Sequence, residues 1–495
     1  MSSGGKRLYK SLDDNISEIK QIFRDDDGLV IRSFRNRDNP IFKFCVLFIE
    51  GMTDNKLIDQ YIIQPVIQYP IPGYLVGDMD VISEQVVLSH NVEKVCDFAD
   101  LAERILRGES ILLMDRCDKA LALSTEGWKS RDITEPESEK VQRGPREGFV
   151  EDINTNLTMI RRKLPTTNLK VRNMIIGKQT RTKVSICYLD DIANKDILNE
   201  LINRLEKIDF DSILDSGFIV EFIEDSPYSL FDTVGSTERP DIAVAMMLQG
   251  HIVVVVDGTP SVLTVPFLMN EYFITNDDYY INFYFSSVSR IVRVISFFIT
   301  VLLPAFYVAI LTYHQEMIPS PLLFSISAAR EGIPFPTVVE TLGLLVVFEI
   351  LREVGMRVPM QIGQSLSILG AVVLGTAAVE ARLVSSSVII VIALTGLTGI
   401  MSIKIKGPAI LIRFSFVLLA GFLGLYGIVW GIIVVTLHLC SLRSFGVPYM
   451  MPYTSLKPGE VANTIIRAPL RFLNKRDKFV SGENKMKMEK KDISK

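Results

Sequence analysis

Residues 409–442 read AILIRFSFVLLAGFLGLYGIVWGIIVVTLHLCSL, and this apolar stretch decides the class of fold. A helix needs about 20 mostly apolar residues to cross the hydrocarbon core of a bilayer. The stretch is therefore long enough for one strongly tilted helix or for a tight helical hairpin. Either interpretation makes the chain a membrane protein.

Further apolar segments precede this stretch and predict an α-helical transmembrane domain over 289–443. They lie at about 291–313, 337–351, 359–379 and 383–403. Their basic flanks, and the Lys-rich tail at 444–495, belong on the cytoplasmic side by the positive-inside rule; the flanks are Arg290, Arg293, Arg352, Arg357, Lys404 and Lys406. With both chain ends inside, we expect four complete spans with broken or hairpin segments, or six.

The composition describes two unlike halves. The chain has 495 residues, of which 48% are hydrophobic and 22% charged, and its mean hydropathy is +0.28. These values are too apolar for an ordinary soluble enzyme and too charged for an all-membrane protein. The net charge of −4 argues against a nucleic-acid partner. Because the first residues lack the apolar core of a secretory signal, we expect a cytoplasmic N-terminal domain.

The soluble half contains an internal repeat, which predicts two related α/β subdomains at 41–135 and 148–275. An N-terminal arm at 1–40 precedes them, with a short helix capped by Ser11 and Asp14. Gly250 and Asp257 occupy the places of Gly108 and Asp115 about 140 residues earlier. The alternative is chance similarity between two hairpins.

Hydrophobic periodicity predicts the individual elements of the two subdomains. The first has a linker at 25–40, a strand at 41–51, helices at 53–68 and 91–109, and a hairpin at 108–125. The second has a strand, acidic turn and helix at 182–208, a strand at 218–225, a helix at 239–250, and a hairpin at 250–266.

No motif of an enzyme or a metal site occurs in the chain. A Walker loop, HExxH and GxSxG are all missing, and the five cysteines are scattered without CxxC spacing. Asp-Gly at 257–258 is what a tight turn requires, so it needs no catalytic role. We therefore expect no catalytic residue, no metal and no cofactor.

The segment at 277–293 places several aromatic residues ahead of Arg290 and Arg293. Aromatic and basic residues suit the headgroup layer, so this segment is predicted as an interfacial helix that leads into the first span. A core amphipathic helix is the alternative.

Four prolines interrupt the segment at 314–340: Pro319, Pro321, Pro334 and Pro336. Irregular backbone at membrane depth is tolerated only where protein covers it or where it lines a cavity. We interpret the prolines as hinge or re-entrant positions, with an exposed surface loop as the alternative.

Charged residues in the apolar segments are candidates for a pore or a gate. They are Glu340, Glu349, Glu380 and Arg352. Buried charge in a bilayer is costly, and an oligomer would repeat each carboxylate as a ring along an ion path. The alternative is local pairing, of Glu349 with Arg352 and of Glu380 with Arg382, that only holds helices together.

Several strings resemble the A subunit of spore nutrient germinant receptors, the GerA family. They include GPREGFVEDINTNLTMIRRKL, SLFDTVGSTERPD, TYHQEMIPSPLLFSISAAREGIPFP, FEILREVGMRVP and LCSLRSFGVPYMMP, in order between about 40 and 460. The resemblance implies a subunit of the spore inner membrane with a transporter-like B subunit and a lipoprotein C subunit as partners. It further implies a homo-oligomer that forms or gates an ion-conducting path and so triggers germination. A non-conducting scaffold, a secondary transporter and a membrane-anchored enzyme are the alternatives.

Overall fold

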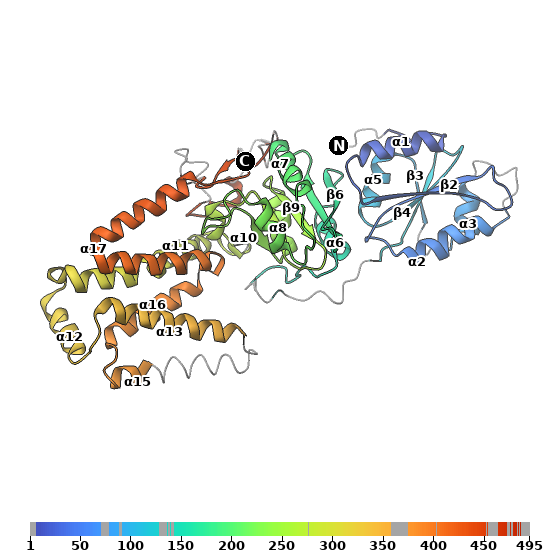
Figure 1. The fold of residues 1–495 in the computed structure, drawn as a ribbon. Helices are drawn as coiled ribbons and strands as arrows, with labels where there is room; N and C mark the ends of the chain where they lie inside the picture. The colour runs from blue at the N-terminus through green and yellow to red at the C-terminus, as the bar shows by residue number, and fades with distance from the viewer. Residues whose placement is uncertain are drawn as a thin grey trace.

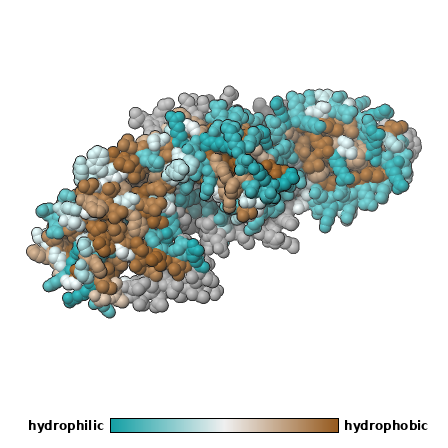
Figure 2. Space-filling model, in the orientation of Figure 1, coloured by the Kyte–Doolittle hydropathy of each residue, from teal (hydrophilic) through white to brown (hydrophobic). Residues whose placement is uncertain are grey.

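A computed structural model describes most of the chain. The described residues are 6–70, 79–88, 92–127, 136, 139, 143–275, 277–357, 375–401, 403–451, 453, 464–472, 476, 479–482, 484 and 486. Three bodies follow one another along the molecule: a first α/β subdomain, a second α/β subdomain and a bundle of helices (Figure 1). Hydrophobic residues gather on the surface of the helices, and hydrophilic residues cover much of both subdomains (Figure 2).

The first subdomain is a five-stranded antiparallel sheet with helices on both faces. Its strand order is β1-β2-β4-β5-β3. Because side chains alternate along a strand, β2 sends Cys45, Leu47 and Ile49 to one face and Phe44, Val46 and Phe48 to the other. The strands are β1 (Leu29–Arg35), β2 (Lys43–Ile49), β3 (Val92–Val95), β4 (Ser110–Met114) and β5 (Ala120–Leu123).

Helices α1 (Leu12–Ile22) and α5 (Phe98–Leu106) cover the first of these faces. The Ser11 side chain accepts a hydrogen bond from the Asp14 N–H, which confirms the predicted helix start. The other face is covered by α2 (Asn55–Leu57), the π-helix η1 (Ile58–Ile63), α3 (Gln64–Gln68), α4 (Met79–Val81) and the π-helix η3 (Ile82–Val86).

The second subdomain repeats this arrangement. Its strand order is β6-β7-β9-β10-β8, so each hairpin, β4–β5 and β9–β10, holds the same place in its sheet. The strands are β6 (Leu169–Ile176), β7 (Thr182–Leu189), β8 (Gly235–Thr237), β9 (Ile252–Val256) and β10 (Val262–Val265). Helices α6 (Ile153–Lys163) and α9 (Pro240–Met247) cover one face, and α7 (Lys195–Glu206) and α8 (Ser216–Ile223) cover the other.

Three predicted elements are wrong. The helix expected at 91–109 begins only at Phe98, because Val92–Val95 is an edge strand paired with β5. The strand expected at 218–225 is helix α8, whose start is fixed by the Asp215 side chain accepting from the Gly217 N–H. The linker expected at 25–40 contains strand β1, which pairs with β2 over its whole length.

A buried ion pair joins the two subdomains. The Asp26 carboxylate accepts from both terminal nitrogens of Arg161 at 2.6 and 3.0 Å, and both side chains are buried. Two further hydrogen bonds cross the same interface. The Asp27 N–H donates to the Val171 carbonyl, and the Thr158 hydroxyl donates to the Gly51 carbonyl. Breaking one partner of such a pair leaves an uncompensated charge, so the pair fixes how the subdomains meet.

The helical bundle follows the second subdomain. It comprises α10 (Asp277–Tyr280), α11 (Phe283–Tyr313), the 3-10 turn η5 (Gln315–Met317), α12 (Ser320–Arg330), α13 (Thr337–Arg357), α15 (Gly375–Glu380), α16 (Ser386–Ile400), the 3-10 turn η7 (Ile403–Ile405) and α17 (Lys406–Ser441). Among the described helices, α11 and α17 are long and apolar enough to cross a membrane, with mean hydropathies of 2.5 and 2.3 over their most apolar stretches. Part of the apolar segment predicted at 359–379 lies outside the described residues.

Helix α17 consists of two arms that fold back on each other at Gly424, which has φ 60° and ψ −143°. A Cβ added to Gly431 in the second arm would lie 2.9 Å from the Phe416 ring in the first. In a straight helix these two residues would be about 22 Å apart. The hairpin alternative for 409–442 is therefore the one that the structure adopts, and both arms of α17 can be followed in Figure 1.

Neighbouring helices of the bundle run in both relative directions. Helices α13 and α16 are parallel, because Glu340 lies beside Ser385 and Phe348 lies beside Gly396, whereas α11 and α16 are antiparallel. Helix α11 contacts α16 through Tyr307 with Ser387 and through Thr300 with Thr398, so one helix rises as the other descends. The turn of α17 lies beside Tyr313 and His314 at the end of α11. We call this the far end of the bundle, and the opposite end, which faces the second subdomain, the near end.

Candidate functional site

Three of the four predicted charged residues, Glu340, Glu349 and Arg352, belong to two separate groups of ion pairs. The distal pair, at the far end, joins Arg330 to Glu340. The proximal pairs, closer to the near end, join Glu349 to Arg352 and Arg413. Helix α13 supplies all of the acidic partners, because Glu340 and Glu349 lie two and a half turns apart on it.

Glu340 is fully buried in the first turn of α13. One carboxylate oxygen accepts from the Ser385 hydroxyl at 2.6 Å and from the Ser385 N–H, at the start of α16. The other oxygen stands 3.8 Å from the Arg330 guanidinium and has no hydrogen-bond partner among the described residues. This carboxylate therefore connects α12, α13 and α16.

Glu349 pairs with two arginines in the middle of α13. Arg352 lies one turn further along the same helix, and Arg413 reaches across from the first arm of α17. The Arg413 side chain is buried, and its Nε has no partner among the described residues. Local pairing of Glu349 with Arg352 was one of the alternatives, and the link to α17 is additional.

Glu380 differs from the other two carboxylates. It is exposed at the end of α15, and no ion pair joins it to Arg382 in the part of the chain that the structure describes. The alternative of local pairing between Glu380 and Arg382 is therefore not the one that the structure adopts. Its side chain is free to meet solvent, lipid or another chain.

The four prolines mark helix boundaries. Pro319 is the N-cap of α12 and Pro321 lies in its first turn, where the missing N–H has no intrahelical acceptor to lose. Pro334 lies in the connection to α13, and the Pro336 carbonyl accepts from the Glu340 N–H in the first turn of α13. Helix α12 has no buried residue. A hinge or re-entrant role for this segment stays a prediction.

The chain beyond α17 returns to the second subdomain and enters its core. We call residues 443–451 and 479–482 the C-terminal clasp; it includes the two-stranded hairpin of β11 (Arg443–Ser444) and β12 (Val447–Pro448). Four apolar clasp residues are buried in the cluster between the sheet and helices α7 and α8: Phe445, Val447, Met451 and Val480. The predicted basic tail is therefore partly an element of the soluble fold.

Polar contacts fix the clasp in place. The Phe445 N–H donates to the Asp225 carboxylate at 2.6 Å, and the Arg204 guanidinium lies over the Phe445 ring. The Ser444 hydroxyl donates to the Thr233 carbonyl at 2.6 Å. Further along, the Gly482 N–H donates to the Ile192 carbonyl at 2.7 Å. The clasp thus contacts the second subdomain at several residues that are far apart in the sequence.

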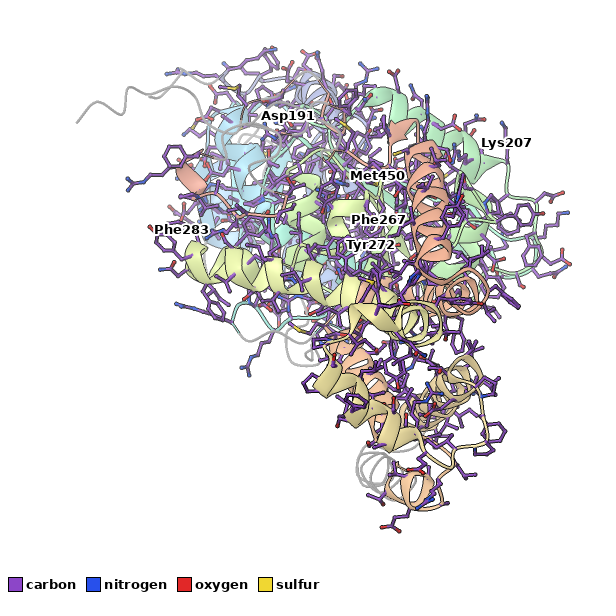
Figure 3. All side chains as sticks on the ribbon, turned by 90° about the vertical axis from the view of Figure 1, so that its left-hand side faces the viewer. Asp191, Lys207, Phe267, Tyr272, Phe283 and Met450 are labelled. Atoms are coloured by element: carbon purple, nitrogen blue, oxygen red, sulfur yellow. The ribbon has the colours of Figure 1, made fainter. Side chains whose placement is uncertain are left out.

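A buried tyrosine pair lies where the clasp, the second subdomain and the bundle meet. Tyr272, in the 3-10 turn η4 (Met269–Tyr272), donates to the Asp232 carboxylate, and Tyr449 of the clasp donates to the Asp232 carbonyl. Burial raises the pKa of the Asp232 carboxyl and of both phenols. Phe267 and Met450 lie in the same apolar cluster, beside Tyr272 (Figure 3).

The arginines at the start of α11 do not face a headgroup layer. Arg290 is fully buried, and both Arg290 and Arg293 donate to the Asp278 carboxylate at 2.6 to 3.1 Å. The prediction that Arg290 and Arg293 lie in the headgroup layer is therefore wrong, because Asp278 neutralises both cations inside the protein. Helix α11 itself continues without a break from Phe283.

A contact also joins the bundle to the connection between the subdomains. Lys404, at the near end between α16 and α17, lies 3.0 Å from the Glu139 carboxylate. Glu139 in turn accepts from the Thr237 hydroxyl at 2.6 Å, at the edge of the second sheet. The bundle is therefore linked to the second subdomain at a point away from the clasp.

Two other features concern ligands. A cavity of about 190 Å³ lies between the subdomains; its lining includes Gly51, Thr53, Asn154, Thr158 and Arg162. No cluster of three or more possible metal-binding side chains occurs among the described residues.

The predicted charged residues thus lie in three places, and their strongest partners were not predicted. Arg413 is the single Arg, Lys, Asp or Glu in the apolar stretch 409–442, which is by itself a signal for a buried ion pair. The sequence does not single out Arg330 and Ser385 as partners of Glu340, because these contacts depend on how α12 and α16 pack against α13.

Comparison with known proteins gives consistent matches along the chain. Residues 17–479 match a family model described as Bacillus/Clostridium GerA spore germination protein. The chain is 39% identical over 485 residues to spore germination protein KA of Bacillus subtilis, covering 98% of this chain and 89% of that protein. It is 34% identical over 484 residues to spore germination protein GerLA of Bacillus cereus, covering 96% and 97%.

A solved structure also matches. It is the crystal structure of the N-terminal domain of the A subunit of the Bacillus megaterium spore germinant receptor GerK3. The identity is 32%, the TM-score is 0.42, and the match covers 52% of this chain and 96% of that chain.

Proposed function

Because this chain belongs to the GerA family of spore germination proteins, we propose that it is the A subunit of a nutrient germinant receptor and that it forms or gates an ion-conducting path. The observation that carries the proposal is the C-terminal clasp. Its residues Phe445, Val447 and Met451, which follow directly after α17, lie in the core of the second subdomain. A rearrangement of the soluble region therefore has a direct mechanical route into the bundle.

The clasp also restricts how the bundle crosses the membrane. The chain enters the bundle from the second subdomain at Phe283 and returns to that subdomain after Ser441. Both flanking segments lie on one side, so the number of crossings is even. We propose six: α11, α13, a passage between α13 and α16, α16, and the two arms of α17. The shared side is the cytoplasm, in keeping with the basic flanks.

We propose that the ion pairs hold the bundle in a closed state. The distal pair ties α13 to α12 and α16, and the proximal pairs tie α13 to the first arm of α17. Opening then requires α13 to separate from at least one neighbour. Signal binding can drive this only by the difference in its affinity for the closed and open states. Glu380 is exposed at the far end, where copies of the chain in an oligomer would repeat it as a ring.

The test is ion flux through purified full-length chain in liposomes. Glu340→Gln should raise flux, because it weakens the distal pair. The double variant Glu349→Gln with Arg413→Gln should do the same; it removes both buried charges and leaves only the partly exposed Arg352 without its carboxylate. Glu380→Gln should lower flux if the carboxylate lies on the path. Glu316→Gln, at an exposed carboxylate outside both groups of ion pairs, is the control.

A strictly monomeric chain, or flux that no carboxylate variant alters, would contradict the conducting role. A non-conducting scaffold is the second candidate, and one observation favours it: Glu340 and Glu349 are both paired within the chain. In that case the Glu340 and Glu349 variants would weaken assembly with a transporter-like B subunit and a lipoprotein C subunit while flux stays at background.

The remaining expectations belong to the same proposal. We place the complex in the spore inner membrane, with the B and C subunits as partners, and we expect no catalytic activity. A measured dissociation constant for a nutrient on the isolated chain, in the range found for the whole receptor, would move the sensing role onto this subunit.

A further inference from the structure

A second part of the C-terminal region lies beside the start of α11. The Arg290 guanidinium donates to the Thr464 carbonyl, and the Ser287 hydroxyl donates to the Arg467 carbonyl at 3.2 Å. Arg467 in turn donates to the Ile281 carbonyl, and its guanidinium lies over the Tyr279 ring. Residues 464–472, which end in the 3-10 turn η8 (Leu470–Phe472), therefore pack against the first two turns of α11.

Apolar side chains of both segments point away from the protein. On residues 464–472 the exposed fractions are 58% for Ile466, 54% for Leu470 and 75% for Phe472. On the first half of α11 the large exposed apolar side chains form one stripe toward the far end: Tyr284, Phe285, Val288, Val292, Ile295 and Phe298. We call the surface formed by Tyr284, Phe285, Val288, Ile466, Leu470, Arg471 and Phe472 the junction face.

The length of α11 places the junction face at the membrane surface. Helix α11 has 31 residues and so is about 46 Å long, whereas the hydrocarbon core of a bilayer is about 30 Å thick. Roughly the first ten residues of α11 therefore extend beyond the hydrocarbon on the near side. Phe283, at the start of this extension, lies at the edge of the molecule (Figure 3).

The charge on the junction face comes from the C-terminal region. Arg290 and Arg293 are bound to Asp278, so they contribute no exposed cation. Arg471 is exposed on η8. Exposed apolar and aromatic side chains next to an exposed arginine are the composition of segments that lie in an anionic headgroup layer.

We propose that the junction face docks onto the headgroups of anionic phospholipids at the near side of the membrane. Ile466, Leu470 and Phe472 enter the boundary between headgroups and acyl chains, and Arg471 contacts lipid phosphate. A second copy of the chain is a poorer occupant, because it would bring the same positive charges together. The stripe on α11 also runs without interruption from the junction face into the membrane span. The inference holds whether or not the chain conducts ions.

The test uses the full chain in lipid nanodiscs with one tryptophan as a reporter. The two native tryptophans, Trp128 and Trp430, are replaced by phenylalanine, and Phe472→Trp is introduced. In discs that contain phosphatidylglycerol, the emission should shift to shorter wavelength and be quenched by lipids brominated in the acyl chain. Ile41→Trp, at an exposed apolar position of the first subdomain, is the control and should not be quenched.

A companion variant tests the role of charge. Replacing Arg471 by glutamine should lower the docking equilibrium constant in phosphatidylglycerol discs by about fivefold. In discs of phosphatidylcholine alone, the same replacement should have little effect. Equal quenching in neutral and anionic discs would overturn the anionic preference.

An unquenched Phe472→Trp in every lipid would overturn the proposal outright. If that tryptophan were instead shielded from a water-soluble quencher, and a cysteine at Leu470 cross-linked between copies, the junction face would be a protein interface. Neither result depends on ion flux, so failure here is distinct from failure of the conducting role.

Discussion

The two α/β subdomains share one strand order but differ in what completes their cores. Both apolar clusters of the first subdomain are built from residues between Leu8 and Leu123. The second subdomain takes Phe445, Val447, Met451 and Val480 from beyond the helical bundle. The same fold thus serves once as a separate unit and once as the base to which the membrane helices are fastened. The predictions below test this difference.

The largest effect is expected at the ion pair between the subdomains. Asp26→Ala leaves the buried Arg161 guanidinium unpaired, which should cost about 3–5 kcal/mol. Hydrogen exchange should rise at the interface, near 22–28 and 158–173, and the bundle should keep its protection. The double variant Asp26→Leu with Arg161→Met should recover most of the loss. Increased exchange throughout α17 would mean that the first subdomain also supports the bundle.

A matched pair of core substitutions separates the subdomains directly. Phe445→Ala should destabilise the second subdomain by about 3 kcal/mol and loosen the second arm of α17, because the clasp joins them. Ile105→Ala, at a fully buried position of the first subdomain, should cost a similar amount without reaching the bundle. Hydrogen exchange measured by mass spectrometry on the full chain distinguishes these outcomes. The contrast fails if both variants loosen α17 equally.

Acid should tighten the clasp. Burial raises the pKa of Asp232, and burial together with the nearby Asp232 charge raises the pKa of Glu224. The stability linked to a raised carboxyl pKa is fully present below the ordinary value of about 3.9 for Asp. It is lost as the pH rises through the higher folded value.

Protection of 443–451 from exchange should therefore increase as the pH is lowered from about 7 toward the raised pKa. The exchange rates must first be corrected for their intrinsic pH dependence. Asp232→Asn should reduce this response, while exchange in the first subdomain serves as the internal reference. If the clasp instead loosened in mild acid, the raised pKa of Asp232 could not be what controls its stability.

The smallest effect is expected at the contact between Lys404 and Glu139. Both side chains retain some exposure, so Lys404→Ala should cost about 0.5 kcal/mol and less at high salt. Glu139→Ala should cost more, because it also removes the acceptor for the Thr237 hydroxyl. A loss of about 2 kcal/mol or more with Lys404→Ala would instead make this contact a second principal link to the bundle.

The sequence was informative where the signal was local. The hairpins β4–β5 and β9–β10 were predicted at 108–125 and 250–266, and helix α9 was predicted at 239–250. The prediction of a helix at 92–95 was wrong because four residues are too few for their spacing to distinguish an edge strand from a helix. At 216–223 the aromatic and β-branched residues favoured a strand, but the Asp215 cap and packing against α7 decided for a helix.

The site was predicted in part. Glu340 and Glu349 were identified from their cost in an apolar segment, but the identity of their partners depends on which helices become neighbours. Arg413 lies 64 residues from Glu349 along the chain, and no local pattern connects the two. The clasp escaped prediction for the same reason, because LCSLRSFGVPYMMP is too short and too mixed to show that its apolar residues belong to a distant sheet.

The clasp has a consequence for how the molecule is made. Strands β6 to β10 and helices α6 to α9 are synthesised before any bundle helix, yet their core lacks Phe445 and Val480 until the last helix has been translated. Domains generally fold from the N-terminus during synthesis, so the first subdomain can close early while the second waits with an open apolar side. Chains that fail to insert all of their helices would keep that side open, and a quality-control protease could distinguish them from finished chains.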